Sequence, residues 1–316
     1  MGVCAVSKVQ PIVVDARDIA AVDSVTLSEL ANSTVGCTSS DTRRALWHKL
    51  LAPAMYLDDK EQKMEFERLE AAVKSVDAKH LRVIDNDIPR TDRSRDEWRD
   101  PSALEPLRRI LVAHLARSPD IGYYQGMNDI AAVIWTAIPE LPHAFFYFSA
   151  WVDMHRQNWL PALKGIWQQA SAILAVLQVV DAPLAAQLAE YSFPDQPLPF
   201  LFQAIFLRLK REMKSYEETK RLWEVCWAVR MAKPDGEHYD LLCIAALVLS
   251  QRGKLLRRKA LSPMEGLAMV KQVFSDLRGT QRAKPLLRRA HSLLRMSAVR
   301  TALKLDDDTK TESAIY

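Results

Sequence analysis

Apolar residues recur at steps of three and four positions along most of this 316-residue chain. In residues 103–117, for example, one stripe is formed by Leu104, Leu107, Leu111 and Leu115. This spacing is typical of amphipathic helices, whereas the alternating pattern that strands require is confined to short fragments. The sequence therefore predicts an all-α fold in which proline and glycine separate one helix from the next.

The same pattern predicts where the helices lie. We expect a short helix that ends at Pro53, followed by a charged amphipathic helix over residues 58–79. Residues 84–102 are polar and bounded by proline, so we expect a long loop, and loops of that length inside a domain are usually functional or disordered. The remaining helices are expected at residues 103–117, 129–138, 142–157, 160–178, 182–190, 199–213, 216–231, 237–252, 264–276 and 283–304.

The pattern also divides the chain into three parts. Residues 1–30 have no clear period and are interpreted as an N-terminal extension, and residues 305–316 form a polar C-terminal tail. The helical domain between them covers residues 31–304. That length suits one large domain or two small helical units.

Several classes of function are excluded by what the sequence lacks. It has no GxxxxGK[ST] or GxGxxG motif, so no phosphate-binding or dinucleotide-binding loop is expected. It also has no HExxH, GxSxG or CxxC pattern, which argues against metal-dependent and covalent catalysis. No uninterrupted apolar run reaches the roughly 18–20 residues of a membrane span. Four scattered cysteines are typical of reduced thiols, so we expect a cytoplasmic protein.

Two short motifs occur in a specific order. The string IDNDIPRT (residues 84–91) fits the pattern IxxDxxR, and YYQGMN (residues 123–128) follows it and fits YxQ. The ordered pair resembles the signature of TBC-domain proteins, which are the GTPase-activating proteins of Rab GTPases. The string DIPRTDR (residues 87–93) further resembles the subgroup in which Arg-Thr-Asp-Arg follows the aspartate of the first motif.

The resemblance extends over residues 34–300. Residues 36–51, with Arg43 and Trp47, are similar to the opening segment of that family, and residues 200–227 are similar to a late motif that contains KRE and LWE strings. One departure is clear, since Gln203 and Ala204 stand where the family often has Arg-Trp. The resemblance implies a TBC-type domain of two packed helical halves, and we assign Trp47, Trp223 and Trp227 to its core.

The resemblance also implies how the chain acts. Arg90 is the expected arginine finger and Gln125 the expected glutamine finger, supplied in trans to a Rab-family GTPase in its GTP form. Arginine suits this task because its planar, always-charged guanidinium presents donors in a fixed geometry. Glutamine suits water orientation because its amide both accepts and donates. The chain would be an enzyme activator in vesicle trafficking that needs no cofactor, since the partner holds GTP and Mg²⁺.

The neighbouring residues receive supporting roles. We expect Asp87 to orient the Arg90 guanidinium, since a carboxylate can hold the fork while it leaves donors free. Residues expected to frame the glutamine turn and meet the GTPase are Tyr123, Tyr124 and Gly126, and Thr91 and Arg93 are expected to face the partner as well. Met127 and Asn128 are assigned to helix-start packing and capping.

Two alternatives remain open at this point. The chain could be a Rab-binding scaffold without catalytic effect, although the presence of both fingers argues against this. It could also dock on an anionic surface through its basic C-terminal third, between Arg252 and Lys304. The overall net charge of +4 is too balanced to indicate a nucleic-acid binder, so we expect no specific nucleic acid and only a weak membrane contact.

Overall fold

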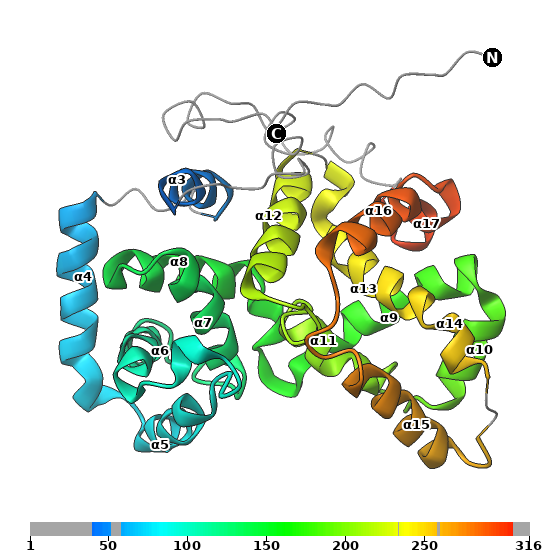
Figure 1. Ribbon diagram of the computed structural model, residues 1–316, viewed down its shortest axis with the longest axis horizontal. Helices are drawn as coiled ribbons and strands as arrows, with labels where there is room; N and C mark the ends of the chain where they lie inside the picture. The colour runs from blue at the N-terminus through cyan, green and yellow to red at the C-terminus, as the bar shows by residue number, and fades with distance from the viewer. Residues whose placement is uncertain (1–39, 52–57, 233, 258–259, 306–316) are drawn as a thin grey trace, which may run out of the picture.

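The computed structural model describes residues 40–51, 58–232, 234–257 and 260–305 (Figure 1). Within those ranges the chain forms helices joined by turns, with two isolated bridges and no strand. The predicted all-α fold is therefore confirmed. The predicted extension over residues 1–30 lies outside the described residues, as does all but the first residue of the predicted tail.

The first half of the molecule is a group of helices around α6. Helix α6 (Glu105–Arg117) contacts α4 (Asp59–Ala71), α5 (Ala78–Asp87), α7 (Met127–Ala137) and α8 (Leu141–Met154). The leucines predicted to share one stripe are all buried at these contacts. Burial of that stripe, at about 25 cal/mol per Å² of apolar surface, is what holds the amphipathic helices together.

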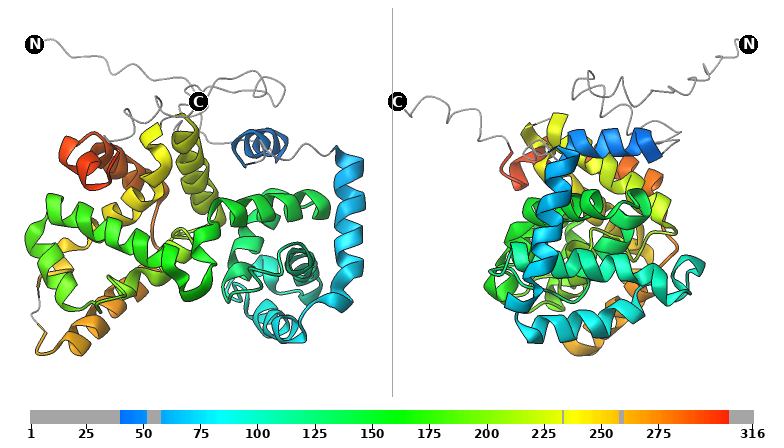
Figure 2. Two further views of the ribbon diagram at one scale, coloured as in Figure 1. Left: turned by 180° about the vertical axis from the view of Figure 1, so that it is seen from behind. Right: turned by 90° about the vertical axis from the view of Figure 1, so that its left-hand side faces the viewer.

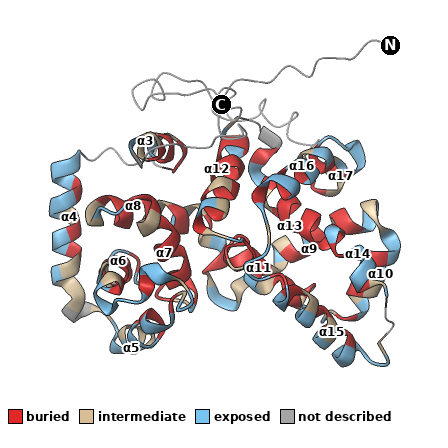
Figure 3. Ribbon diagram, viewed as in Figure 1, coloured by how far each residue is buried: buried red, intermediate tan, exposed pale blue. Residues whose placement is uncertain are grey.

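The second half is built around α13 (Tyr239–Ser250). This helix contacts α9 (Lys164–Val180), α11 (Phe202–Phe206), α12 (Tyr216–Ala232) and α16 (Ala283–Leu294). Residues 241–249 are buried without exception, as Figure 3 shows, because neighbouring helices cover α13 on all sides. The outer helices of this half are α10 (Ala182–Glu190), α14 (Arg252–Leu255), α15 (Pro263–Ser275) and α17 (Ser297–Ala302).

Helix α12 joins the two halves. It contacts α3 (Ser40–Leu51) and α7 on one side and α13 and α16 on the other, and Figure 2 shows the same division from behind. The Nε of Arg43 and the Nε1 of Trp47 both donate to the Oε1 of Glu224 at 2.8 Å. The rings of Trp47 and Trp227 meet edge to face, with centroids 5.1 Å apart. Both rings and that of Trp223 are buried, so their predicted place in the core is confirmed.

The predicted helix over residues 58–79 is wrong in its second half. Helix α4 ends at Ala71, a 3₁₀ turn covers Ala72–Ser75, and α5 then begins at Ala78. The break occurs because the side chain of Asp77 accepts a hydrogen bond from the backbone N–H of Lys79, which makes Asp77 the N-cap of a new helix.

The predicted loop over residues 84–102 is wrong at its start. Helix α5 continues to Asp87, and a 3₁₀ turn, Ile88–Arg90, extends it directly. Ile84 and Ile88 are both buried, one helical turn apart, so packing holds this segment in helical form despite the polar residues between them. Two further 3₁₀ turns, Asp96–Trp98 and Pro101–Leu104, lie in the rest of the segment.

Two other predicted helices are shorter than expected. The segment 199–213 forms only a 3₁₀ turn and α11, and it then turns irregularly at Arg208 and Leu209, whose φ angles are 46° and 61°. The segment 283–304 is broken between α16 and α17. In the segment 199–213, the irregular turn leads the chain from the second half of the molecule to the edge of the first half.

One segment, Pro161–Val180, is long and apolar enough by length and composition to cross a membrane. The segment is not an uninterrupted apolar run, because Lys164 and several glutamines lie within it. In this structure α9, which forms most of the segment, packs against α10, α13 and α17. Its buried face, which includes Ile166, Ile173 and Leu177, is that of an amphipathic helix in a helical core.

Candidate functional site

Arg90 and Gln125 lie at the rim of one open groove of about 500 Å³. Arg90 ends the 3₁₀ turn that continues α5, and Gln125 lies in the turn just before α7. Both side chains are exposed. The two residues expected to act together therefore face the same space, although they come from separate segments.

Four segments line this groove. Residues 87–95 and 125–129 come from the first half, and residues 210–213 and 278–279 come from the second. The groove therefore lies where the two halves meet, between α5 and α7 on one side and the chain beyond α11 and α15 on the other (Figure 1). Its charged residues are Asp87, Arg90, Asp92, Arg95, Asp129, Lys210, Arg211 and Arg278.

A buried hydrogen-bond network joins the two segments that carry Arg90 and Gln125. The hydroxyl of Tyr123 lies 2.9 Å from the Oδ2 of Asp87 and 3.2 Å from the Oδ1 of Asn128. The Nδ2 of Asn128 donates to the Oγ1 of Thr91 at 2.9 Å. Burial, together with the nearby Asp87 carboxylate, raises the pKa of Tyr123, so its hydroxyl stays protonated as a donor. We call Asp87, Thr91, Tyr123 and Asn128 the Tyr123 network.

This network corrects the expected role of Asp87. Its carboxylate is buried and bonds to Tyr123, and within the described residues no ion pair joins it to Arg90. The reason is that α5 continues through Asp87 and directs this residue inward, while Arg90 follows on the exposed side of the next turn. Asp87 therefore holds the backbone segment rather than the guanidinium.

Two further residues expected to face the partner are buried instead, while the expected contact of Tyr124 stays a prediction. Thr91 and Tyr123 are buried and serve the Tyr123 network, so neither faces solvent. Tyr124 is half-buried, and its ring packs near Trp159 and Phe206, with centroids 5.9 and 6.5 Å away. Sequence motifs place such residues next to Arg90 and Gln125 but do not indicate which way their side chains face.

Arg93 and Gly126 keep positions consistent with their expected roles. Arg93 is exposed, and its Nε donates to the backbone oxygen of Pro89 at 2.7 Å. Gly126 has a φ of 111°, and a Cβ there would lie 3.2 Å from the ring of Phe206. Only glycine fits this left-handed turn comfortably, so Gly126 sets the position of the neighbouring Gln125.

The base of the groove is a charged network that the sequence reasoning missed. The Nζ of Lys210 lies 2.7 Å from both carboxylate oxygens of Asp92 and 2.5 Å from the Oδ1 of Asp129. Arg211 donates to the Oδ2 of Asp129 at 2.7 Å. Burial alone would raise the pKa of Asp129, but the charges and hydrogen bonds of Lys210 and Arg211 hold it below its usual value.

Two aromatic residues extend this charged network. The hydroxyl of Tyr216 donates to Asp92, and the Nε1 of Trp98 donates to that hydroxyl at 2.6 Å. The only sequence signal for this charged network was the KRE string (residues 210–212), which we had used only as part of the family resemblance. Nothing in the sequence pairs Asp92 or Asp129 with Lys210.

Gln203 and Ala204, where the chain departs from the family pattern, have different environments. Ala204 is buried in the core at α11. Gln203 is exposed, and its Oε1 accepts a hydrogen bond from the Nη2 of Arg278 at 3.0 Å. Because Arg278 lines the groove, this departure lies beside the candidate site.

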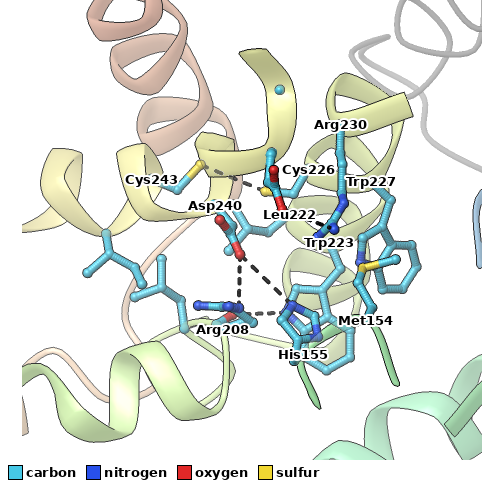
Figure 4. Close-up of a pocket in the computed structure, with 14 residues that line it drawn as sticks. Met154, His155, Arg208, Leu222, Trp223, Cys226, Trp227, Arg230, Asp240 and Cys243 are labelled. Atoms are coloured by element: carbon cyan, nitrogen blue, oxygen red, sulfur yellow. Dashed lines mark hydrogen bonds and ion pairs between the residues drawn. The ribbon is translucent and has the colours of Figure 1, made fainter. Parts of the chain in front are cut away.

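A second cavity, shown in Figure 4, lies between α12, α13 and the residues that follow α8 and α11. It has about 20 Å³ of free space, room for about one water molecule. The Nε of Arg208 lies 2.9 Å from the Oδ2 of Asp240, and burial lowers the pKa of His155 well below its usual value. A hydrogen bond shared with Cys243, together with burial, raises the pKa of the Cys226 thiol, which makes it a poor nucleophile.

The described part of the chain contains no group of three histidine, cysteine, aspartate or glutamate residues placed to hold a metal ion. The groove is the candidate site because Arg90 and Gln125, both exposed, line it together, and these two side chains supply cationic and amide donors.

Residues 40–256 match the model of the Rab-GTPase-TBC domain family. The chain belongs to this family. The match spans both halves and all but the last of the four segments that line the groove. The assignment to the subgroup with the Arg-Thr-Asp-Arg string stays a prediction.

Curated relatives show similarity at about 30% identity. The chain is 30% identical over 151 residues to Rab GTPase-activating protein tbc-8 of Caenorhabditis elegans, which covers 48% of this chain and 16% of that protein. It is 27% identical over 241 residues to TBC1 domain family member 17 of Mus musculus, covering 70% of this chain and 36% of that protein. It is 31% identical over 166 residues to Rab GTPase-activating protein 22 of Arabidopsis thaliana, covering 48% and 29%. The chain thus spans well under half of each of these relatives.

Two solved structures share the fold. The Ypt/Rab-GAP domain of Gyp1p aligns with a TM-score of 0.66 at 15% identity, over 86% of this chain and 93% of that one. The Chlamydomonas flagellar RabGAP TBC domain aligns with a TM-score of 0.64 at 13% identity, over 85% of each chain. The expected TBC-type, all-α architecture is therefore confirmed.

Proposed function

We propose that this chain accelerates GTP hydrolysis by a Rab-family GTPase in its GTP form. The observation that carries the proposal is the pair of exposed side chains, Arg90 and Gln125, at the rim of one groove in a TBC-family domain. Two of the relatives above carry the name Rab GTPase-activating protein, which supports the same function.

The first catalytic group in this proposal is Arg90. In GTP hydrolysis water attacks the γ-phosphorus, the bond to the β–γ bridging oxygen breaks, and negative charge accumulates on the oxygens. Within the described residues Arg90 makes no ion pair, so its guanidinium is free to meet those oxygens. The partner binds GTP and Mg²⁺, and this chain acts as an activator with no cofactor and no GTPase activity alone.

The second group is Gln125. Its amide oxygen accepts a hydrogen bond from the attacking water while its N–H₂ donates to a phosphate oxygen. The left-handed turn at Gly126 and the start of α7 hold Gln125 toward the groove. The Tyr123 network links this turn to the segment of Arg90, so both groups are positioned before the partner binds.

The test is GTP hydrolysis by a panel of purified Rab GTPases with and without the wild-type chain. We expect acceleration of at least one Rab by several orders of magnitude. Binding to a Rab loaded with a non-hydrolysable GTP analogue, with no acceleration, would instead indicate the scaffold alternative. Neither binding nor acceleration across the panel would contradict the proposal.

Removing one hydroxyl from the Tyr123 network is expected to impair positioning. Tyr123→Phe leaves the buried Asp87 carboxylate without its hydroxyl donor, which should lower the free energy of unfolding by about 1–3 kcal/mol. We expect kcat for stimulated hydrolysis to fall by about tenfold with KM little changed, because the two fingers lose their common support.

The matched control is Tyr191→Phe, in the turn after α10 and away from the groove. It removes a hydroxyl that has no hydrogen bond among the described residues, and both its thermal unfolding and its kcat should equal those of the wild type. Equal kcat values for Tyr123→Phe and the wild type would show that the network does not position the fingers.

We also propose that the chain is cytoplasmic, acts in vesicle trafficking and makes a weak contact with anionic membranes. The support is a set of exposed cations that form no ion pair within the described residues: Lys254, Arg257, Arg282, Lys284, Arg288 and Arg289. Each such charge adds about 1 kcal/mol near an anionic surface. Arg288→Glu combined with Arg289→Glu should therefore reduce cosedimentation with phosphatidylserine-containing vesicles. Equal sedimentation with pure phosphatidylcholine vesicles would contradict a charge-driven contact.

A further inference from the structure

Arg278 is held at the edge of the groove by backbone hydrogen bonds across two segments. The N–H of Gly279 donates to the oxygen of Arg211 at 2.9 Å, and the N–H of Thr280 donates to the oxygen of Glu212 at 3.1 Å. Gly279 has a φ of 67°, which only glycine adopts easily. The backbone of Arg278 is therefore fixed against the charged network that forms the groove's base.

The charges around the groove leave Arg278 available to a partner. Five cationic and three anionic side chains line it. Lys210 and Arg211 are paired with carboxylates, and Arg95 lies 4.0 Å from Asp92. Of the guanidinium groups that line the groove, those of Arg90 and Arg278 form no ion pair within the described ranges. The lining of the groove therefore has a net positive charge and two separate guanidinium groups that are not paired with a carboxylate.

We propose that Arg278 binds a carboxylate on the surface of the GTP-bound Rab, opposite the side on which Arg90 acts. This proposal rests on the proposed function and adds a contact that determines affinity. The two fingers come from the first half, whereas Arg278 comes from the second, beyond α15. In the complex, Arg278 therefore contacts the part of the Rab surface that lies against the second half of this domain.

Gln203 supports this assignment. Its Oε1 accepts from one nitrogen of Arg278 and leaves the other guanidinium donors free for a bidentate pair with a carboxylate. An arginine at position 203 would place a like charge against Arg278. A glutamine at position 203 is therefore compatible with an arginine at position 278. On this side of the groove the guanidinium group is supplied by Arg278 instead of residue 203.

The experiment measures steady-state GTP hydrolysis by the Rab of the panel that the wild-type chain activates most. Arg278→Ala should raise KM by about five- to tenfold and leave kcat within about twofold, because the contact is equal in the ground and transition states. Arg278→Lys should restore part of the loss, and Arg278→Glu should raise KM further than alanine does. The double variant Gln203→Arg with Arg278→Gln should recover most of the affinity, because it returns a guanidinium to the same wall.

Two controls separate this role from a structural one. Arg82→Ala removes an exposed charge of α5 outside the groove and should leave KM unchanged. Arg278 is also near the buried Glu212, whose pKa burial raises, so thermal unfolding of each variant is compared with the wild type. A melting temperature equal to that of the wild type with a raised KM supports the proposal.

The failure of this proposal differs from failure of the proposed function. If the wild type activates a Rab and Arg278→Ala has an unchanged KM, Arg278 has no such role while the function stands. If Arg278→Ala instead lowers kcat at constant KM, Arg278 acts on the phosphates of the bound GTP, and the proposed carboxylate contact is overturned. If the wild type binds a Rab without activating it, the affinity is measured instead as the dissociation constant for the Rab loaded with a non-hydrolysable GTP analogue. The ratios of variant to wild type expected for KM then apply to this dissociation constant. No Rab bound or activated would overturn both.

Discussion

Arg90→Ala is expected to lower the stimulated rate of GTP hydrolysis by roughly 10³–10⁵-fold, the range for removal of an arginine finger. This corresponds to about 4–7 kcal/mol of lost transition-state stabilisation. Arg90 is exposed and forms no ion pair within the described residues, so the variant should unfold at the wild-type temperature. Single-turnover hydrolysis by the responsive Rab measures the loss.

The matched control for Arg90 is Arg99→Ala. Arg99 is an exposed arginine of the same segment that pairs with Asp96 and does not line the groove. We expect wild-type activity from this control. Arg90→Lys should also be severely impaired, because an ammonium group keeps the charge but not the planar fork of donors. Full stimulation by Arg90→Ala would rule out the arginine-finger mechanism.

Gln125→Ala should lower the stimulated rate by roughly 10²–10⁴-fold, the usual contribution of a group positioned to assist water attack. Binding to the GTP form of the Rab should change little, since the amide acts on the attacking water. Gln272→Ala is the matched control, because Gln272 is an exposed glutamine of α15 outside the groove.

The family resemblance implies that Gln125 acts in place of the GTPase's own glutamine, and a variant Rab tests this expectation. A Rab whose own active-site glutamine is changed to alanine should still respond to the wild-type chain and should not respond to Gln125→Ala. If that Rab no longer responds to the wild-type chain, the water is oriented by the GTPase and Gln125 only contacts the partner.

The sequence predicted the helical fold well because most helices bury one continuous apolar stripe. Helix α8, for example, covers Leu141–Met154 against a predicted 142–157. The predicted helix boundaries are wrong where a helix cap or a contact with a distant segment outweighs the local spacing of apolar residues. Asp77 starts a new helix inside an apparently continuous amphipathic segment. Ile84 and Ile88 keep a polar segment helical through burial against the first half.

The candidate site was predicted only at its two motif residues. Arg90 and Gln125 are exposed and line one groove, whereas Tyr123 and Thr91, expected at the partner surface, are buried in the protein and do not line the groove. Of the groove residues, Lys210 was marked only by the KRE string of the family resemblance, and Arg278 had no local signal for a role there. Their neighbours in space are far away in sequence, and no spacing rule connects them.

Amphipathic periodicity and two ordered motifs thus determined the fold class, the family and the two residues most important to the proposed chemistry, because these depend on local spacing. The tertiary structure alone decided which polar residues point inward, as Asp87 does, and which cations remain unpaired, as Arg278 does. Burial, hydrogen bonding and charge pairing are properties of residues brought together from distant segments. They are therefore fixed only when the two halves of the domain pack around α12.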